Sequence, residues 1–338
     1  MSMMNDFKIE GQFPAFIEPV HRLDFQGFIQ CVQNNKTFLH DLLLKHGALV
    51  FRGFPVSDAD HFAKVIQALQ LGHFVNYIGG DSPRDKVEDY VYTSTEAPPS
   101  FHIPLHQELS FVKHFPRHIY FYCDIEPVHG GETIIGDARQ IYRAIHPQVR
   151  QQFEENQLTY ISRYYYQSNI MKMINHFQRS HKSWTEVFET NDKQEVEQKC
   201  VANEFAWHWL SRDWLQISQT RPATILHPQT QEQVWFNQAH LYDFNPKLLG
   251  WKNYIGAQLF YFRKSTRLHE IRFANKESIA RKNIYHILDI LKQNTVAFPW
   301  QKGDVMVMDN VLAMHGRAPF QGKRRILTAL TSQPYIFA

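Results

Sequence analysis

The sequence predicts a mixed α+β fold in which helices surround a β core. Three stretches rich in β-branched and aromatic residues indicate core strands, namely HIYFYCDI (118–125), GDVMVMDN (303–310) and RRILTALTS (324–332). Helical patterns lie before and between them. The stretch 156–221 differs from its neighbours because it contains two capped helical segments. We therefore expect an insertion at 156–221 that lies over the β core.

The N-terminal region combines helices with a short buried strand. In LLLKHGALVFRGF (42–54), a helix is expected to end at Gly47, and an apolar strand follows it up to Gly53. Ser57 or Asp58 is positioned to cap the next helix. The following stretch, YIGGDSPRDKVEDYVYTSTEAPPS, is rich in Gly, Pro, Ser and Asp and predicts loops around one short strand.

The rest of the chain alternates between strands and helices. VHGGETIIGD predicts a turn at Gly130–Gly131 that leads into a strand, and residues 137–155 have a helical pattern. Within the insertion, Ser183 and Glu186 form a capping box. A strand at 232–237 and a helical region at about 276–293 precede the last two core strands.

Composition and charge exclude several classes of protein. Hydrophobic residues make up 43% and charged residues 20% of the 338 positions, which is typical of an ordinary globular chain. The net charge is only +3 and Lys and Arg form no dense stripe, so we expect no nucleic-acid partner and no membrane partner. No signal peptide or long apolar segment is evident, and we expect a cytoplasmic protein. Three cysteines without a CxxC pair argue against a disulfide framework or a thiolate zinc site.

One short motif, His106-Gln-Glu108, suggests a metal site. Of the nineteen histidines, only His106 has an acidic residue two positions later, and in a strand residues i and i+2 share one face. A third ligand is needed, and His315 is the best candidate because it follows the buried strand 303–310 just before Gly316. Two histidines and one carboxylate form the facial triad of non-haem Fe(II) oxygenases.

Other interpretations of these residues remain open on spacing alone. A metal-dependent hydrolase can use the same ligand types, although the HExxH motif of such zinc sites is missing here. A non-catalytic metal-binding jelly-roll protein is a further alternative. An arginine near 325 could clamp the remote carboxylate of a dicarboxylic co-substrate. Spacing cannot decide between Arg324 and Arg325, which face opposite sides of a strand, and 323–325 could also be a solvated basic turn.

Taken together, many sequence blocks resemble a known family. The chain resembles the Fe(II)/2-oxoglutarate dioxygenases of the taurine dioxygenase (TauD/TfdA) group, and most of all its clavaminate-synthase-like and syringomycin-pathway-like hydroxylases. The resemblance runs through most of the chain in family order. Its blocks are GALVFRGF, YIGGDSPR, PLHQELSFVKHFPRHIYFYC, GGETIIGDAR, SWTEVFETNDKQEVEQKC, HPQTQEQVWFNQ and GDVMVMDNVLAMHGRAPFQGKRRIL.

The resemblance implies a fold and a set of site residues. It implies a double-stranded β-helix (jelly-roll) core with flanking helices, a single domain over 1–338, and a helical lid at 156–221. The positions that match the family's motifs give Fe(II) as the metal, bound by His106, Glu108 and His315. They also give 2-oxoglutarate as the co-substrate beside dioxygen, with its far carboxylate bound by Arg325 and contacted by Thr133.

The resemblance also narrows the reaction. A halogenase lacks the carboxylate ligand so that chloride can bind, and Glu108 therefore points to hydroxylation. Ala329 stands where the taurine enzyme has an arginine for the sulfonate, so we do not expect taurine as the substrate. We expect hydroxylation of an aliphatic C–H bond in a small amino-acid-like substrate of secondary metabolism, free or bound to a peptidyl carrier protein. Another small carboxylic acid or an amine is the alternative, and a homo-oligomer is compatible with this function.

Overall fold

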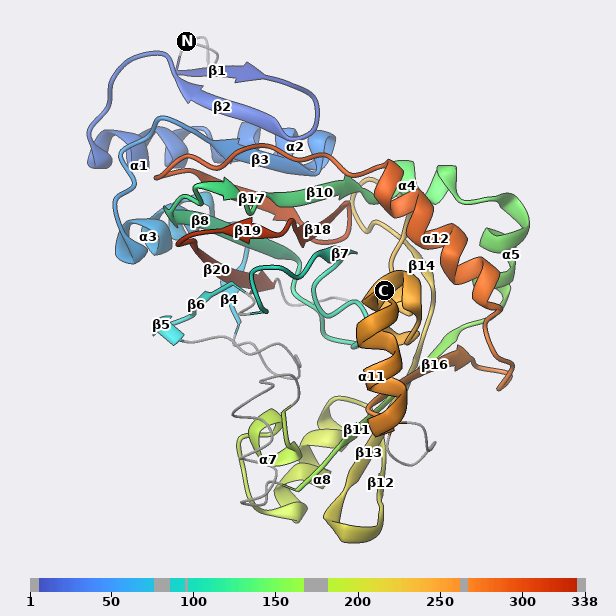
Figure 1. Cartoon of the computed structure of the whole chain (residues 1–338). Coiled ribbons are helices and arrows are strands. Elements are labelled where there is room, and N and C mark those ends of the chain that lie inside the picture. Colours follow the sequence, from blue (N-terminus) through green and yellow to red (C-terminus); the bar gives the residue numbers. More distant parts are fainter. Residues whose placement is uncertain (1–5, 76–85, 95–96, 167–181, 262–266, 333–338) are drawn as a thin grey trace.

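The computed structural model describes residues 6–75, 86–94, 97–166, 182–261 and 267–332 (Figure 1). The block YIGGDSPR at 77–84 lies outside the described residues. Within them, two β-sheets face each other and helices cover the outside, so the predicted α+β jelly-roll core is confirmed. The strands that form this core come from both ends of the chain, which brings distant sequence motifs together.

The larger sheet provides one wall of the core. Its nine strands run in the order β1 (Phe7–Glu10), β2 (Ala15–Pro19), β3 (Ala48–Phe51), β17 (Val305–Asp309), β8 (His118–Ile125), β20 (Arg325–Ser332), β6 (Val91–Thr93) and β5 (Lys86–Glu88), with β4 (His73–Phe74) also paired to β20. The three predicted core strands are thus neighbours at the centre of this sheet.

The smaller sheet provides the opposite wall and carries the candidate ligands. Its three strands run in the order β10 (Thr133–Asp137), β18 (Ala313–Arg317) and β7 (Ile103–His106). Two short strands, β9 (His129–Gly130) and β19 (Phe320–Gln321), pair with each other. Along the chain, β9 directly precedes β10 and β19 directly follows β18. Because β7 and β18 are antiparallel neighbours, residues about 200 positions apart are brought side by side.

Side-chain alternation along the central strands explains why both faces of the larger sheet are buried. Met306 and Met308 of β17 point between the two sheets, where they pack with Phe121. Val305 and Val307 point to the opposite face and pack under the N-terminal helices. A strand that is covered on both faces needs a continuous apolar run rather than an alternating one, and VMVMD satisfies that requirement.

The N-terminal helices cover the outer face of the larger sheet. They are α1 (Phe25–Asn34), α2 (Lys36–His46) and α3 (Ala59–Leu69). The α2 helix ends at Gly47, whose φ of 74° is readily adopted by glycine, and β3 follows directly. The carboxylate of Asp58 caps α3 by accepting a hydrogen bond from the backbone N–H of His61 at 2.9 Å. Both boundaries agree with the sequence prediction.

Three further helices lie on the side of the smaller sheet. They are α4 (Ala138–Ala144), α5 (Pro147–Glu155) and α12 (Arg281–Gln293), and α12 contacts both β7 and α4. The predicted helical stretch 137–155 is in fact two helices, because Pro147 begins a new helix and its ring removes one backbone donor.

The insertion 156–221 contains the expected helices and also three strands. The helices are α7 (Trp184–Val187), which begins with the predicted Ser183–Glu186 capping box, and α8 (Lys193–Ala202). The strands are β11 (Leu158–Tyr164), β12 (Ala206–Trp209) and β13 (Leu215–Arg221), and the short η1 (Ser211–Asp213) lies between β12 and β13. Together with β16 (His269–Phe273) they form a separate four-stranded sheet in the order β12, β13, β11, β16. This sheet lies in the lower half of Figure 1.

The remaining elements connect the insertion to the core. They are β14 (Thr224–Leu226), β15 (Gln233–Trp235), α9 (Ala239–Tyr242), α10 (Pro246–Leu249) and α11 (Trp251–Tyr261). Among the described residues, no helix has both the length and the apolar character needed to cross a bilayer. Cys31, Cys123 and Cys200 are buried and form no disulfide, in agreement with their odd number and spacing.

Candidate metal centre and co-substrate cleft

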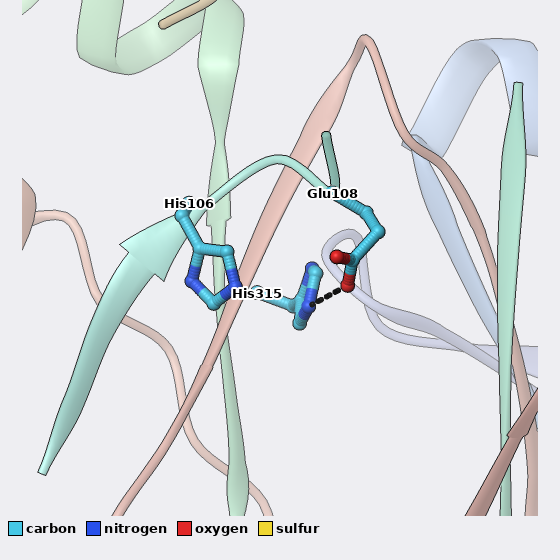
Figure 2. Close-up of side chains that lie close together, drawn as sticks. All are labelled: His106, Glu108 and His315. Atoms are coloured by element: carbon cyan, nitrogen blue, oxygen red, sulfur yellow. Dashed lines mark ion pairs between the residues drawn. The ribbon is translucent and has the colours of Figure 1, made fainter. Parts of the chain in front are cut away.

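The three residues predicted to bind the metal lie together at one end of the smaller sheet. His106 is the last residue of β7 and is the direct register partner of His315 in β18. Glu108 follows two residues later, and its Oε2 lies 3.6 Å from Nε2 of His315 (Figure 2). One potential ligand atom from each of the three residues lies within 4.8 Å of the other two. The arrangement is that of a two-histidine, one-carboxylate metal site.

The environment of His106 suits a metal ligand. Its Nδ1 lies 2.9 Å from the carbonyl oxygen of Pro104, so the Nδ1–H donates to the backbone and leaves Nε2 free of a proton. Burial and the neighbouring His315 lower the pKa of His106 to about 3, although Glu108 partly opposes the shift. The imidazole is therefore neutral at physiological pH, as metal coordination requires.

Glu108 is held in place by the side chain of Asn310, at the end of β17. The backbone N–H of Glu108 donates to Oδ1 of Asn310 at 2.7 Å, and Nδ2 of Asn310 donates to the Glu108 carbonyl at 2.9 Å. The same Nδ2 also donates to the carbonyl of Pro116 at 2.8 Å. A single buried amide thus fixes the backbone that carries the carboxylate. The sequence analysis missed this residue.

An ionised cluster fixes the segment that contains Asn310. Arg117 lies 3.0 Å from Oδ2 of Asp309, and Nε2 of His227 lies 3.0 Å from the same oxygen. Burial alone would raise the pKa of Asp309, but Arg117 and His227 hold it below its usual range, so the carboxylate stays charged. Its Oδ1 accepts the backbone N–H groups of Val311 and Leu312 at 2.9 and 3.1 Å. These contacts of Asp309 fix the conformation of the connection between β17 and β18.

A cleft extends from the metal centre toward the start of β20. Thr133 of β10 is buried in its wall, and its Oγ1 accepts a hydrogen bond from Nε1–H of Trp300 at 3.2 Å. Because Trp300 occupies an acceptor position, the hydroxyl hydrogen of Thr133 is free to donate elsewhere. The cleft is lined by Ser94, Ile103, His106, Phe121, Thr133, His315, Gly316, Arg317 and Arg324.

Arg324 supplies the positive charge at the far end of the cleft. Its Nε donates to the carbonyl of Gly131 at 2.8 Å, and one terminal nitrogen donates to Oγ of Ser94 at 3.2 Å. Burial, followed by the neighbouring Arg317, lowers the pKa of Arg324 to about 10, so it remains a cation at neutral pH. Within the described chain, no carboxylate forms an ion pair with it. An anionic ligand would supply the missing partner.

Arg325 is not part of this cleft, and the prediction for it has to be corrected. Its side chain is 46% exposed and one of its terminal nitrogens donates to Oδ2 of Asp124 at 2.7 Å. Along β20, Ile326 packs between the sheets, whereas Ala329 packs under the N-terminal helices. Arg324, just before β20, lines the cleft, whereas Arg325 does not.

The position of Ala329 in β20 also changes the argument about a sulfonate-binding cation. Because Ala329 lies on the helix-covered face, it does not border the cleft, and the matching inner position is Thr328. Thr328 is fully buried and uncharged, so this part of β20 still supplies no cation for a sulfonate. The lack of a cation expected at Ala329 thus holds for its neighbour as well.

The site as a whole combines a place for a metal cation with a place for an anion. Two imidazoles and one carboxylate are suitable ligands for Fe(II). Arg324 and Thr133, further along the cleft, are suitable donors to a carboxylate. A dicarboxylate that chelates the metal at one end could be held by these donors at the other end.

Comparisons with known proteins identify the family. The family model described as taurine catabolism dioxygenase TauD, TfdA family, matches residues 12–331. A clavaminate synthase-like protein of Arabidopsis thaliana is 31% identical over 94% of this chain and 93% of its own length. The dapdiamide synthesis protein DdaC of Enterobacter agglomerans is 32% identical over 88% of this chain and 85% of its own.

A solved structure shows the same fold at low sequence identity. PvcB, an Fe, alpha-ketoglutarate dependent oxygenase from an isonitrile synthetic pathway, superposes with a TM-score of 0.52 at 14% identity, covering 98% of this chain and 93% of its own. The family match extends over nearly the whole chain and includes both strands that carry the candidate ligands. The chain belongs to the TauD/TfdA family and is an Fe(II)/2-oxoglutarate-dependent dioxygenase.

Proposed function

We propose that His106, Glu108 and His315 bind the Fe(II), and that Arg324 and Thr133 bind the far carboxylate of 2-oxoglutarate. The closeness of the three ligand atoms and the neutral state of His106 support the first assignment. The lack of a carboxylate partner for Arg324 in the described chain supports the second. Bound iron would supply the redox chemistry that activates dioxygen for attack on a C–H bond.

We further propose that the reaction is hydroxylation of an aliphatic carbon in a small amino-acid-like substrate. The observation that carries this proposal is Glu108, which occupies the ligand position that a halide would need. In the net reaction, substrate, 2-oxoglutarate and dioxygen give hydroxylated substrate, succinate and carbon dioxide. The protein contributes by holding the reactants close together and by excluding water from the buried cleft.

The names of two similar proteins support a biosynthetic role. DdaC is a dapdiamide synthesis protein, and PvcB belongs to an isonitrile synthetic pathway. By analogy, we propose a role in secondary metabolism, with the amino-acid-like substrate free or bound to a peptidyl carrier protein. Taurine is not proposed, since neither Thr328 nor Ala329 supplies a cation for a sulfonate. A small carboxylic acid or an amine is the alternative substrate class.

We also propose that the chain works as one catalytic domain over 1–338, with 156–221 covering the site. The ligands come from β7 and β18, so neither half of the chain could form the metal centre alone. The insertion borders the site region through Tyr160 of β11, whose ring lies 6.0 Å from that of Phe111 near Glu108.

The function can be tested by substrate-triggered turnover. Anaerobically purified protein would be incubated with Fe(II), 2-oxoglutarate, dioxygen and one candidate substrate, and succinate and product mass would be measured. Free amino acids, carrier-bound amino acids, small carboxylic acids, amines and taurine would be compared. A gain of one oxygen atom on an amino-acid substrate supports the proposal. A chlorinated product, or release of sulfite from taurine, would contradict it.

A further inference from the structure

A second cavity lies outside the metal centre. It has a volume of about 420 Å³, which is within the range of small-molecule sites. Its walls come from β16, from the end of α9, from α11 and from the segment that precedes α12. In Figure 1, β16 and α11 lie close together on the lower right. Nothing in the proposed reaction uses this cavity.

The acidic side chains in the cavity wall are already paired. Glu270 lies 3.2 Å from a terminal nitrogen of Arg163. Asp243 lies 3.3 Å from Nε of Arg281 and also accepts a hydrogen bond from the amide of Asn245 at 3.1 Å. These two carboxylates are therefore neutralised by their own partners and are poorly available to other cations.

Three basic side chains in the same wall have no such partner. In the described chain, Arg267, Arg272 and Lys276 form no side-chain hydrogen bond and no ion pair, although Arg267 acts on Asp243 at longer range. Nε of Arg272 is buried without an acceptor. A buried donor of this kind destabilises the fold unless a ligand or water satisfies it.

The cavity adjoins the loop that carries an iron ligand. Tyr242 lines the cavity, and its ring centroid lies 5.5 Å from that of Phe111, three residues after Glu108. The ring of Tyr242 also lies 5.0 Å from the ring of His269 on β16. A ligand in the cavity would therefore contact a side chain that packs directly on the ligand loop.

We propose that this cavity binds a small-molecule anion carrying several negative charges, of the phosphate or polycarboxylate class. Arg272 and Lys276 would bind the charged groups, and Arg267 would add to the positive potential. Two sources share this chemistry: an anionic part of the oxidised substrate itself, or a separate effector. The proposal does not depend on the assignment of the iron ligands or of Arg324.

Binding can be measured without turnover, so failure here is distinguishable from failure of the proposed function. Metal-free full-length protein would be titrated calorimetrically with pyrophosphate, and in a parallel arm with citrate. We expect one site whose affinity falls at least about tenfold in Arg272→Gln and in Lys276→Gln. Lys252→Gln is the matched control, because Lys252 is exposed on α11 and does not line the cavity. Arg324→Gln should leave the binding unchanged.

The same titrations define the contrary outcomes. No saturable binding of either anion, or equal loss of affinity in Lys252→Gln and Arg272→Gln, would overturn the proposal. Loss of binding only in Arg324→Gln would assign the anion to the co-substrate cleft instead. Once turnover is available, competition between pyrophosphate and the oxidised substrate would identify the anion as part of the substrate. A changed rate without competition would identify a separate effector.

Discussion

The two ends of the co-substrate cleft are built in different ways. At the metal end, two histidines sit opposite each other on paired strands, and Asn310 fixes the backbone of Glu108. At the other end, the charge comes from a long side chain, Arg324, that is held by neutral oxygens only. Strand pairing and backbone hydrogen bonds fix positions closely, whereas a long side chain gains its final position when it binds its partner.

This difference teaches how each end should respond to change. Removing a ligand from the metal end leaves fewer than three donors for iron, so binding and activity should collapse together. Removing the cation from the other end weakens one reactant only, and the iron should remain bound. The predictions below use variants that separate the two ends.

The largest effect is expected from His106→Ala and His315→Ala. Each removes one of the three proposed metal ligands, and even changes in the surrounding shell typically cost 10- to 100-fold in metal affinity. We therefore expect iron affinity to fall by about 100-fold or more and activity to be lost. Iron content after anaerobic reconstitution measures the effect directly. His21→Ala, at an exposed loop position, is the control. Unchanged iron content in both ligand variants would contradict the assignment.

A smaller, more selective effect is expected from Arg324→Gln. A charge-assisted pair with the co-substrate carboxylate contributes roughly 2 kcal/mol. Its loss corresponds to about a 30-fold rise in the apparent KM for 2-oxoglutarate. Iron affinity should stay within about twofold of wild type. Arg325→Gln is a matched control, since it removes the same group from the next residue and from an exposed pair with Asp124. A large effect in Arg325→Gln with none in Arg324→Gln would reverse our correction.

The proximity of the three candidate ligands was easier to predict from the sequence than the position of the arginine, for a physical reason. His106 and Glu108 are two positions apart, and that spacing itself places both on one side of an extended chain. The helix cap at Asp58 and the capping box at Ser183 depend on local hydrogen bonds and were predicted equally well. Family resemblance supplied the jelly-roll core, which no local pattern could reveal.

The arginine end depends on the register of one strand. Adjacent residues of a strand face opposite sides of the sheet, so an error of one position assigns the exposed arginine to the cleft and the cleft arginine to the surface. The apolar pattern of β20, with Ile326 and Leu330 packed between the sheets, could not assign the two arginines, because Arg324 precedes the strand and the register with β8 shifts between Arg325 and Ile326. The role of Asn310 and the strands within 156–221 left no local signal, since they depend on contacts with distant segments.

The smallest effect is expected from Trp300→Phe, which sharpens the comparison within the co-substrate end. Trp300 donates to Oγ1 of Thr133, and without this hydrogen bond the hydroxyl can rotate away from the co-substrate. A hydrogen bond of this kind contributes about 1 kcal/mol, so the 2-oxoglutarate constant should rise about fivefold with kcat nearly unchanged. A general packing defect would instead lower kcat and the melting temperature together. The decisive test is to introduce Trp300→Phe into the Thr133→Val variant. In that double variant, Trp300→Phe should not raise the apparent KM for 2-oxoglutarate further, because the hydroxyl that Trp300 orients is already absent. An additional fivefold rise in that background would show that Trp300 acts through packing rather than through Thr133.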